Sequence, residues 1–267
     1  MIVVTGRAQE SLPIASDAAN VSSAEKRTFL EAICPSHVTG SRCSVCPAEM
    51  PQSAETWELR AIIFGHFIAP RSNDALVSGF GCEPHVKLTS GAYLFTKQGA
   101  AWRKVRYTAG EEADDCKKIT GADGRDRLIC EAAGMHQGAA DEFVYWIESG
   151  DGQQDDPLHL FFTITDSRGS CVQLADGSVR TGHIDSVTFA GDRILVHARG
   201  GKAIVPAEAL QKCQPGANTG FEIMTGPVRY EFRFDGQKVI ADPRNPATDE
   251  YGAAVPTTSY RLAGWIR

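Results

Sequence analysis

This chain of 267 residues lacks long apolar runs and blocks of basic residues. No apolar run approaches the roughly 20 residues that a membrane-spanning helix requires, so we expect no membrane span. The formal net charge is −6, and lysine and arginine are scattered along the chain. A protein of this kind has little with which to neutralise phosphates, so we expect no nucleic-acid partner.

The standard catalytic signatures are also missing. The sequence has no Gly-x-Ser-x-Gly nucleophile elbow, no His-Glu-x-x-His zinc motif, no phosphate-binding loop and no Gly-x-Gly-x-x-Gly after a strand. The acidic pairs Asp114-Asp115 and Asp155-Asp156 lie in polar loops, and we interpret them as solvated. We therefore expect no cofactor, and a binding or scaffold module is favoured over an enzyme.

Eight cysteines are the most informative feature of the composition. Most lie beside polar or turn residues, and such cysteines typically form disulfides outside the reducing cytosol. The pattern favours an extracytoplasmic protein, secreted or periplasmic; the alternative is a mixture of buried free thiols and a metal site. The opening residues MIVVTGRAQE fit either the end of a signal peptide that starts upstream or a disordered N-terminus.

Residues 1–55 are expected to form an N-terminal segment with one helix and a cysteine-rich loop. Ser22 and Glu25 have the spacing of a capping box, and apolar residues follow at helical intervals, so a helix is predicted over 22–33. In the loop, the motif Cys43-x-x-Cys46 favours disulfide bonding. A zinc site completed by Cys34 and His37 and a redox motif are the alternatives.

Residues 56–267 are expected to form an antiparallel, all-β body. Runs of strand-forming residues follow one another, separated by Gly, Asp, Asn or Pro, and no helix of convincing length intervenes. Hairpin turns are predicted at Gly99 and at Asp235-Gly236. The alternative is a two-domain chain with a boundary near 150–158, in which a partial propeller precedes a small barrel or sandwich.

One short pattern occurs twice in the body. Residues 73–77 (NDALV) match residues 125–129 (RDRLI) at a spacing of 52 residues, and residues 191–196 (GDRILV) form a weaker third copy. The aspartate in each copy can bond backbone N–H groups of its own turn ahead of a buried strand. A period near fifty, with several short strands in each period, is typical of β-propeller blades.

The segments FGHFIAPRSNDALVSG (64–79) and ITGADGRDRLIC (119–130) resemble FG-GAP repeats, the blades of integrin-α-type β-propellers. The resemblance covers roughly residues 57–150 and implies propeller-like repeats of about 50 residues. In that family the loop often carries alternating aspartates that chelate calcium.

Here the first loop has apolar residues at those places, and the second retains Asp123 and Asp126 as the candidate ligands. We interpret both loops as structural turns and predict no metal.

Glu83 and His85 are the candidate ligand-binding residues after the first copy of the pattern, and His136 occupies the comparable place after the second. Together they would suit a metal, an anionic ligand or acid–base chemistry. The favoured alternative is that they are unrelated loop residues. The function most consistent with the sequence is therefore a binding or scaffold module for an unknown protein or carbohydrate ligand. The alternative is an extracellular hydrolase or lyase whose acid–base residues come from loops.

The cysteine spacing predicts particular disulfides. CKKIT (116–120) and RLIC (127–130) have the composition of two strands joined by a turn, so an antiparallel hairpin would place Cys116 opposite Cys130. Opposed residues of a non-hydrogen-bonded pair lie about 4.5 Å apart at Cα, which a disulfide tolerates. Cys171 and Cys213 are the next expected pair. The remaining four would tie the N-terminal loop to the first repeat: Cys34, Cys43, Cys46 and Cys82.

Overall fold

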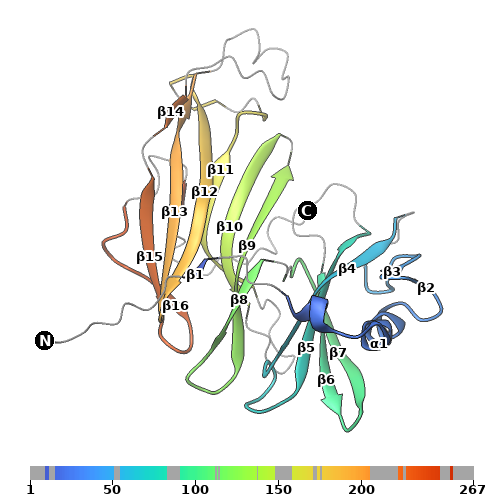
Figure 1. Cartoon of the computed structure of the whole chain (residues 1–267). Helices are drawn as coiled ribbons and strands as arrows, with labels where there is room; N and C mark the ends of the chain where they lie inside the picture. The colour runs from blue at the N-terminus through green and yellow to red at the C-terminus, as the bar shows by residue number, and fades with distance from the viewer. Residues whose placement is uncertain are drawn as a thin grey trace, which may run out of the picture. The chain divides into compact units, whose positions relative to one another are not determined.

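The computed structural model of the chain is mostly antiparallel β-structure with one α-helix, as the sequence predicts (Figure 1). It describes residues 10–11, 16–50, 55–82, 91–111, 113, 115–136, 138–147, 158–170, 173–174, 176–204, 222–224, 227–246 and 253–254. No helix among these residues has the length and apolar character needed to cross a membrane.

The helix forms where the capping signal predicts it. A 3-10 turn, η1 (Asp17–Asn20), precedes helix α1 (Ser23–Ile33). The Oγ atom of Ser22 accepts a hydrogen bond from the backbone N–H of Glu25 at 3.1 Å, which satisfies one of the donors at the helix start. The apolar face of α1 is buried, and Phe29 packs edge-on against Phe95 of the first sheet at a centroid distance of 4.9 Å.

The first sheet has six strands in chain order: β2 (Val38–Thr39), β3 (Arg42–Cys43), β4 (Trp57–Gly65), β5 (Asp74–Gly81), β6 (Gly91–Gln98) and β7 (Ala101–Ala109). Gly99 has φ 62° in the predicted β6–β7 turn. Phe29 of the helix and Trp57 and Tyr93 of the sheet belong to one buried cluster, so the helix and this sheet share a core. The predicted division between residues 55 and 56 remains a prediction.

The second sheet has the order β17-β11-β10-β9-β8. Its strands are β8 (Cys116–Thr120), β9 (Asp126–His136), β10 (Ala139–Ile147), β11 (Leu158–Asp166) and β17 (Ala253–Ala254). Leu128, Ile129 and Cys130 of β9 and Val144 of β10 are fully or almost fully buried. The apolar run after the second turn is therefore core, as expected.

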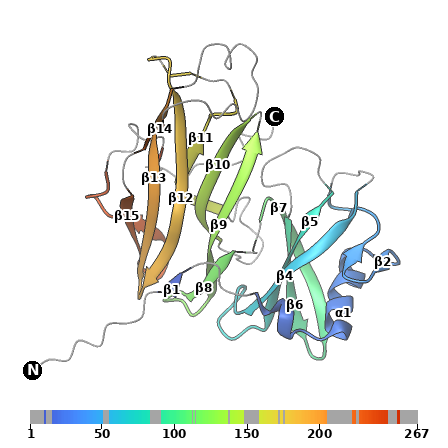
Figure 2. The same cartoon turned by 45° about the horizontal axis from the view of Figure 1, so that its top comes forward.

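The third sheet follows the order β1-β12-β13-β15-β16, with β14 paired to β13 off this path. Its strands are β1 (Glu10–Ser11), β12 (Val179–Ala190), β13 (Arg193–Ala203), β14 (Glu222–Met224), β15 (Val228–Phe234) and β16 (Val239–Ala241). Figure 2 shows the long strands β12 and β13 side by side, as does Figure 1. The predicted hairpin at Asp235-Gly236 joins β15 to β16, and Gly236 has φ 97°.

The first two sheets each contain strands that follow one another along the chain and are neighbours in the sheet, among them β4–β7 and β8–β11. In the third sheet β12, β13, β15 and β16 are neighbours, although β14 lies between β13 and β15 in the chain. The three copies of the aspartate pattern occupy the same place in these runs. Asp74 begins β5, Asp126 begins β9 and Asp192 directly precedes β13, so each copy opens the second strand. The repeat seen in the sequence therefore coincides with a repeat in strand order.

The chain forms two compact units. One contains Pro13–Ala132 and Tyr145–His159, and the other contains Ala133–Val144 and Leu160–Ser259. Strands β9, β10 and β11 thus contribute residues to both units. The sites described below each lie within a single unit.

The described residues form three disulfides: Cys34–Cys43, Cys46–Cys82 and Cys116–Cys130. The predicted Cys116–Cys130 bridge joins register partners of β8 and β9 whose Cα atoms are 4.1 Å apart. Disulfides of this number are typical of proteins that fold in an oxidising environment, outside the cytosol.

The cysteine-rich loop is attached to the first repeat through Cys46–Cys82, as expected. Cys43 and Cys46 belong to different bridges, so this motif is neither a zinc site nor a redox pair. The expected pair Cys171 and Cys213 lies outside the described residues.

Replacing Cys116 and Cys130 together with alanine should lower the free energy of unfolding by about 3 kcal/mol, because the bridge closes a loop of roughly 15 residues. Urea unfolding of the oxidised wild type and the double variant measures this difference. Non-reducing peptide mapping of the wild type is the control and should recover the two cysteines in one linked peptide pair. Recovery of either cysteine with another partner would contradict the hairpin register.

Candidate functional site

The residues singled out from the sequence as a candidate ligand site are not brought together within the described part of the chain. Glu83 and His85 lie outside the described residues. His136 is the last residue of β9, but its side chain is also outside the description. The favoured interpretation, that the three are unrelated loop residues, therefore stays a prediction, and the polar networks described below involve other residues.

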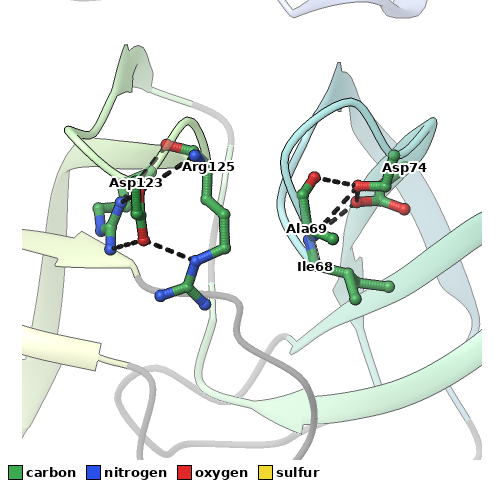
Figure 3. A network of polar contacts seen from close by, with 7 residues as sticks. Ile68, Ala69, Asp74, Asp123 and Arg125 are labelled. Atoms are coloured by element: carbon green, nitrogen blue, oxygen red, sulfur yellow. Dashed lines mark hydrogen bonds and ion pairs between the residues drawn. The ribbon is translucent and has the colours of Figure 1, made fainter.

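Asp74 fixes the turn that precedes its own strand. The residue is 1% exposed, and its Oδ2 accepts hydrogen bonds from the backbone N–H of Ile68 at 2.8 Å and from the hydroxyl of Ser72 at 2.5 Å (Figure 3). The Ser72 hydroxyl also lies 2.7 Å from the carbonyl oxygen of Ala69. The first copy of the pattern thus does what its sequence predicts, because a buried carboxylate bonds the backbone of its own turn.

Asp126 makes a different and longer connection. Its Oδ1 accepts a hydrogen bond from the hydroxyl of Thr120 at 2.7 Å, and Thr120 precedes it by the same six residues that separate Ile68 from Asp74. Its Oδ2 accepts the backbone N–H of His66 at 2.9 Å, and its own N–H donates to the His66 carbonyl at 2.9 Å. The aspartate of the second repeat is therefore bonded to the turn of the first.

The glycine before His66 allows this close contact. A Cβ atom on Gly65 would lie 2.9 Å from Oδ2 of Asp126 and 2.9 Å from the ring of Phe67. Both separations are shorter than real Cβ contacts permit, so a side chain at position 65 would displace the carboxylate. The glycine of the Phe-Gly pair is thus explained by its contact with the second repeat.

Residues Phe64–Ile68, which we call the clamped segment, are held by side chains from four elements. Besides Asp74 and Asp126, Asp17 of η1 accepts the N–H of Phe64 at 3.0 Å, and the ammonium group of Lys118 donates to the Phe64 carbonyl at 2.6 Å. Backbone polar groups that leave a sheet need such partners when they are withdrawn from water. The clamped segment is therefore the point where η1, β5, β8 and β9 are joined.

Asp123, the other candidate calcium ligand, lies against two guanidinium groups. Arg127 donates to Oδ1 at 2.8 Å and to Oδ2 at 2.9 Å, and the Nε atom of Arg125 donates to Oδ2 at 2.7 Å (Figure 3). The hydrogen bonds from Arg127 hold the pKa of the Asp123 carboxyl well below its usual range, and those from Arg125 act in the same direction.

A carboxylate neutralised in this way is a poor ligand for calcium, which supports the interpretation as a structural turn. Among the described residues, no group of three or more His, Cys, Asp or Glu side chains is arranged to hold a metal ion.

The third copy of the pattern has the same place in the strand order as the first two, but its aspartate is not buried. Asp192 is exposed in the short turn between β12 and β13. Its backbone carbonyl accepts the N–H of Phe234 at 2.8 Å. Because the turn between these strands has only two residues, it has no loop of the kind that Asp74 bonds.

A second polar cluster attaches the cysteine-rich loop to the first sheet. The hydroxyl of Tyr93 donates to Oε2 of Glu49 at 3.3 Å, and Lys104 donates to Oε1 at 2.6 Å. Burial raises the pKa of Tyr93, and the nearby Glu49 charge raises it further. Burial alone would raise the pKa of Glu49, but its hydrogen bond with Lys104 and other contacts lower it overall. Tyr93 is thus kept as a neutral donor and Glu49 as a carboxylate acceptor, which suits attachment rather than nucleophilic chemistry.

The pair Glu142 and His183 was missed by the sequence reasoning. The Nδ1 atom of His183 lies 2.7 Å from Oε1 of Glu142, whose Oε2 accepts the backbone N–H of Ile184 at 2.5 Å. An imidazole held by a carboxylate is a common arrangement in acid–base and metal sites. The two residues are 41 positions apart in separate strands and belong to no motif, so the sequence carries no signal for them.

Comparisons of the chain with protein-family models, with curated proteins and with solved structures find no match.

Changing Asp126 to alanine should lower the free energy of unfolding by about 3 kcal/mol, because the His66 N–H and the Thr120 hydroxyl would lose their buried acceptor. The matched control is Asp192→Ala, which removes the aspartate at the same place of the third repeat and should leave stability nearly unchanged. Urea unfolding of the three proteins gives the comparison. Equal losses in the two variants would contradict the role assigned to Asp126.

The Asp123–Arg127 contact should make stability depend on pH in acid. A carboxyl whose pKa is depressed by folding contributes stability above its ordinary pKa of about 3.9, and the contribution is lost as the pH falls below it. Asp123→Asn should therefore be less stable than the wild type at neutral pH, and the difference should narrow below about pH 4. Denaturant titrations at several pH values measure the difference in free energy of unfolding between the two proteins. A difference that does not change with pH would contradict an ionic origin of the stabilisation.

Proposed function

We propose that the chain is a secreted or periplasmic binding or scaffold module without catalytic activity, built from FG-GAP-like, propeller-type blades. The observation that carries the proposal is the bonding of Asp126, in the second repeat, to His66 in the first. This contact makes Asp126 part of a connection between the first two repeats, whereas Asp74 bonds its own turn. Such a role is structural and leaves the carboxylates unavailable for chemistry.

The blade assignment is supported by strand order. Each copy of the aspartate pattern opens the second strand of an antiparallel run of four neighbours, counted from β4, β8 and β12, with β14 interrupting the third run along the chain. A small four-stranded sheet cannot bury both of its faces alone, so repeated sheets of this kind gain stability by packing on one another. The same logic makes blades good supports for binding surfaces, because their exposed faces and loops vary without changing the core.

The extracytoplasmic location is supported by the three disulfides, two of which involve the N-terminal loop. For a module in that location we propose a protein or a carbohydrate as the ligand. Both classes are bound by exposed strand faces and loops, which suits an all-β module.

The second candidate, an extracellular hydrolase or lyase, is favoured by one observation. The imidazole of His183 is oriented by Glu142, as general bases often are. However, 59% of the His183 side chain is exposed, so water surrounds the pair, whereas catalytic sites usually exclude water. The module is therefore preferred.

The oxidised protein should show no activity toward a panel of ester, peptide and glycoside substrates, because its best acid–base pair is open to solvent. Product release by the purified wild type provides the measurement, with Asp192→Ala as a control for any contaminating enzyme. The proposal is wrong if an activity appears and disappears in Glu83→Ala, His85→Ala or His183→Gln while the variant keeps its circular dichroism spectrum.

A further inference from the structure

The outward face of the third sheet carries basic residues directly opposite one another. Strands β13 and β15 pair in a register that places Arg193 opposite Arg233 and His197 opposite Arg229. On the other side of β13, Arg199 stands opposite His183 of β12. Arg193 and Arg233 thus place like charges at opposed positions of an antiparallel pair, which normally destabilises a sheet.

The alternation along β13 shows that these residues share one face. Ile194, Val196 and Ala198 are buried, and the residues between them include Arg193, His197 and Arg199. Successive side chains of a strand point to opposite faces, so the basic residues lie on the face away from the core. We call Arg193, His197, Arg199, Arg229 and Arg233 the basic face.

Few carboxylates offset the basic face. The carboxylate of Glu231 forms an ion pair with Arg193 at 2.6 Å and lies 3.8 Å from Arg229. Asp185 forms an ion pair with Arg199 at 2.5 Å. Four arginines against two carboxylates give a balance of +2, in a chain whose net charge is −6. Glu142, which bonds His183, and the turn residues at the rim bring this balance to zero, so the positive charge is confined to the exposed arginines of β13 and β15: the rim residues are Asp192, Asp235, Lys238, Asp242 and Arg244.

The guanidinium groups are accessible. The exposed side-chain fractions are 46% for Arg193, 49% for Arg199 and 58% for Arg229. A single carboxylate, Glu231, thus lies within reach of two exposed arginines. Arginine offers several N–H donors, so a guanidinium that has one protein partner can still bind a second anion.

We propose that the basic face binds a linear polyanion, an acidic polysaccharide that carries carboxylates or sulfates. This inference rests on the proposed function, because it names a ligand class for a module without catalysis. Four residues of a strand span about 13 Å, so the opposed pair Arg193 and Arg233 and the more distant Arg229 lie along the direction of the strands, where an extended anionic chain can contact both positions.

A polysaccharide is a better fit than an acidic protein. Protein interfaces usually have an apolar core surrounded by a polar rim. In the register of the basic face, Leu195 is only 8% exposed and Ile240, on the edge strand β16, is 37% exposed. The described part of this face therefore offers charge and hydrogen-bond donors with little apolar surface between them.

The test measures binding of the full oxidised chain to heparin and to polygalacturonate by titration calorimetry, with neutral dextran as the uncharged control. Binding to both polyanions, absent with dextran, is expected. Raising the salt concentration from ~20 mM to ~200 mM should weaken the binding because exposed charges become screened.

Two variants locate the site. Arg229→Gln with Arg233→Gln should weaken polyanion binding by at least about tenfold, the effect of losing one good charge-assisted hydrogen bond. The matched control, Lys26→Gln with Arg27→Gln on helix α1, makes the same change in net charge elsewhere and should have little effect. Glu231→Gln should tighten binding, because it removes the carboxylate that competes for Arg193; a damaged fold would not produce this gain.

The inference is overturned if the two double variants lose affinity equally, or if neither polyanion binds. Binding of poly-L-glutamate as tight as that of the polysaccharides would also overturn it, in favour of an acidic protein partner. Failure of polyanion binding would leave the proposal of a non-catalytic module unaffected. An enzymatic activity would instead contradict the proposal that the module is non-catalytic, and it would leave the result of the binding measurement unaffected.

Discussion

The capture of backbone groups by buried carboxylates is the interaction on which the described architecture of the first two repeats depends. The clamped segment Phe64–Ile68 contains the last two residues of β4 and the turn that follows, where the strand ends. Asp17, Asp74 and Asp126 supply acceptors for three of its N–H groups, and Lys118 supplies a donor for one carbonyl. Unsatisfied groups in this position would cost more than the hydrogen bonds contribute when formed, so the aspartates are needed to let the turn pack.

Features encoded within about fifteen residues could be predicted from the sequence. The start of helix α1 follows from Ser22 and Glu25, the β6–β7 turn from Gly99, and the Cys116–Cys130 bridge from the composition of the hairpin between them. Each depends on backbone geometry that a few neighbouring residues determine. The role of Asp74 in its own turn belongs to the same class.

Contacts between distant segments could not be predicted in the same way. Asp126 reaches His66 across 60 positions, and Glu142 reaches His183 across 41. The basic face exists because two strand registers align arginines and histidines that are scattered in the sequence. A change of one residue in either register would send half of these side chains to the opposite face, so composition alone carries no information about them.

The backbone amides of His66 and Ile68 lie two residues apart in the clamped segment, but their acceptors belong to different repeats. The N–H of Ile68 is bonded within its own repeat, whereas that of His66 is bonded to the next repeat. Exchange of the first amide with solvent deuterium requires the turn to open, and exchange of the second requires Asp126 to leave His66. Their relative protection thus reports whether the first two repeats open as one cooperative unit or separate before either unfolds.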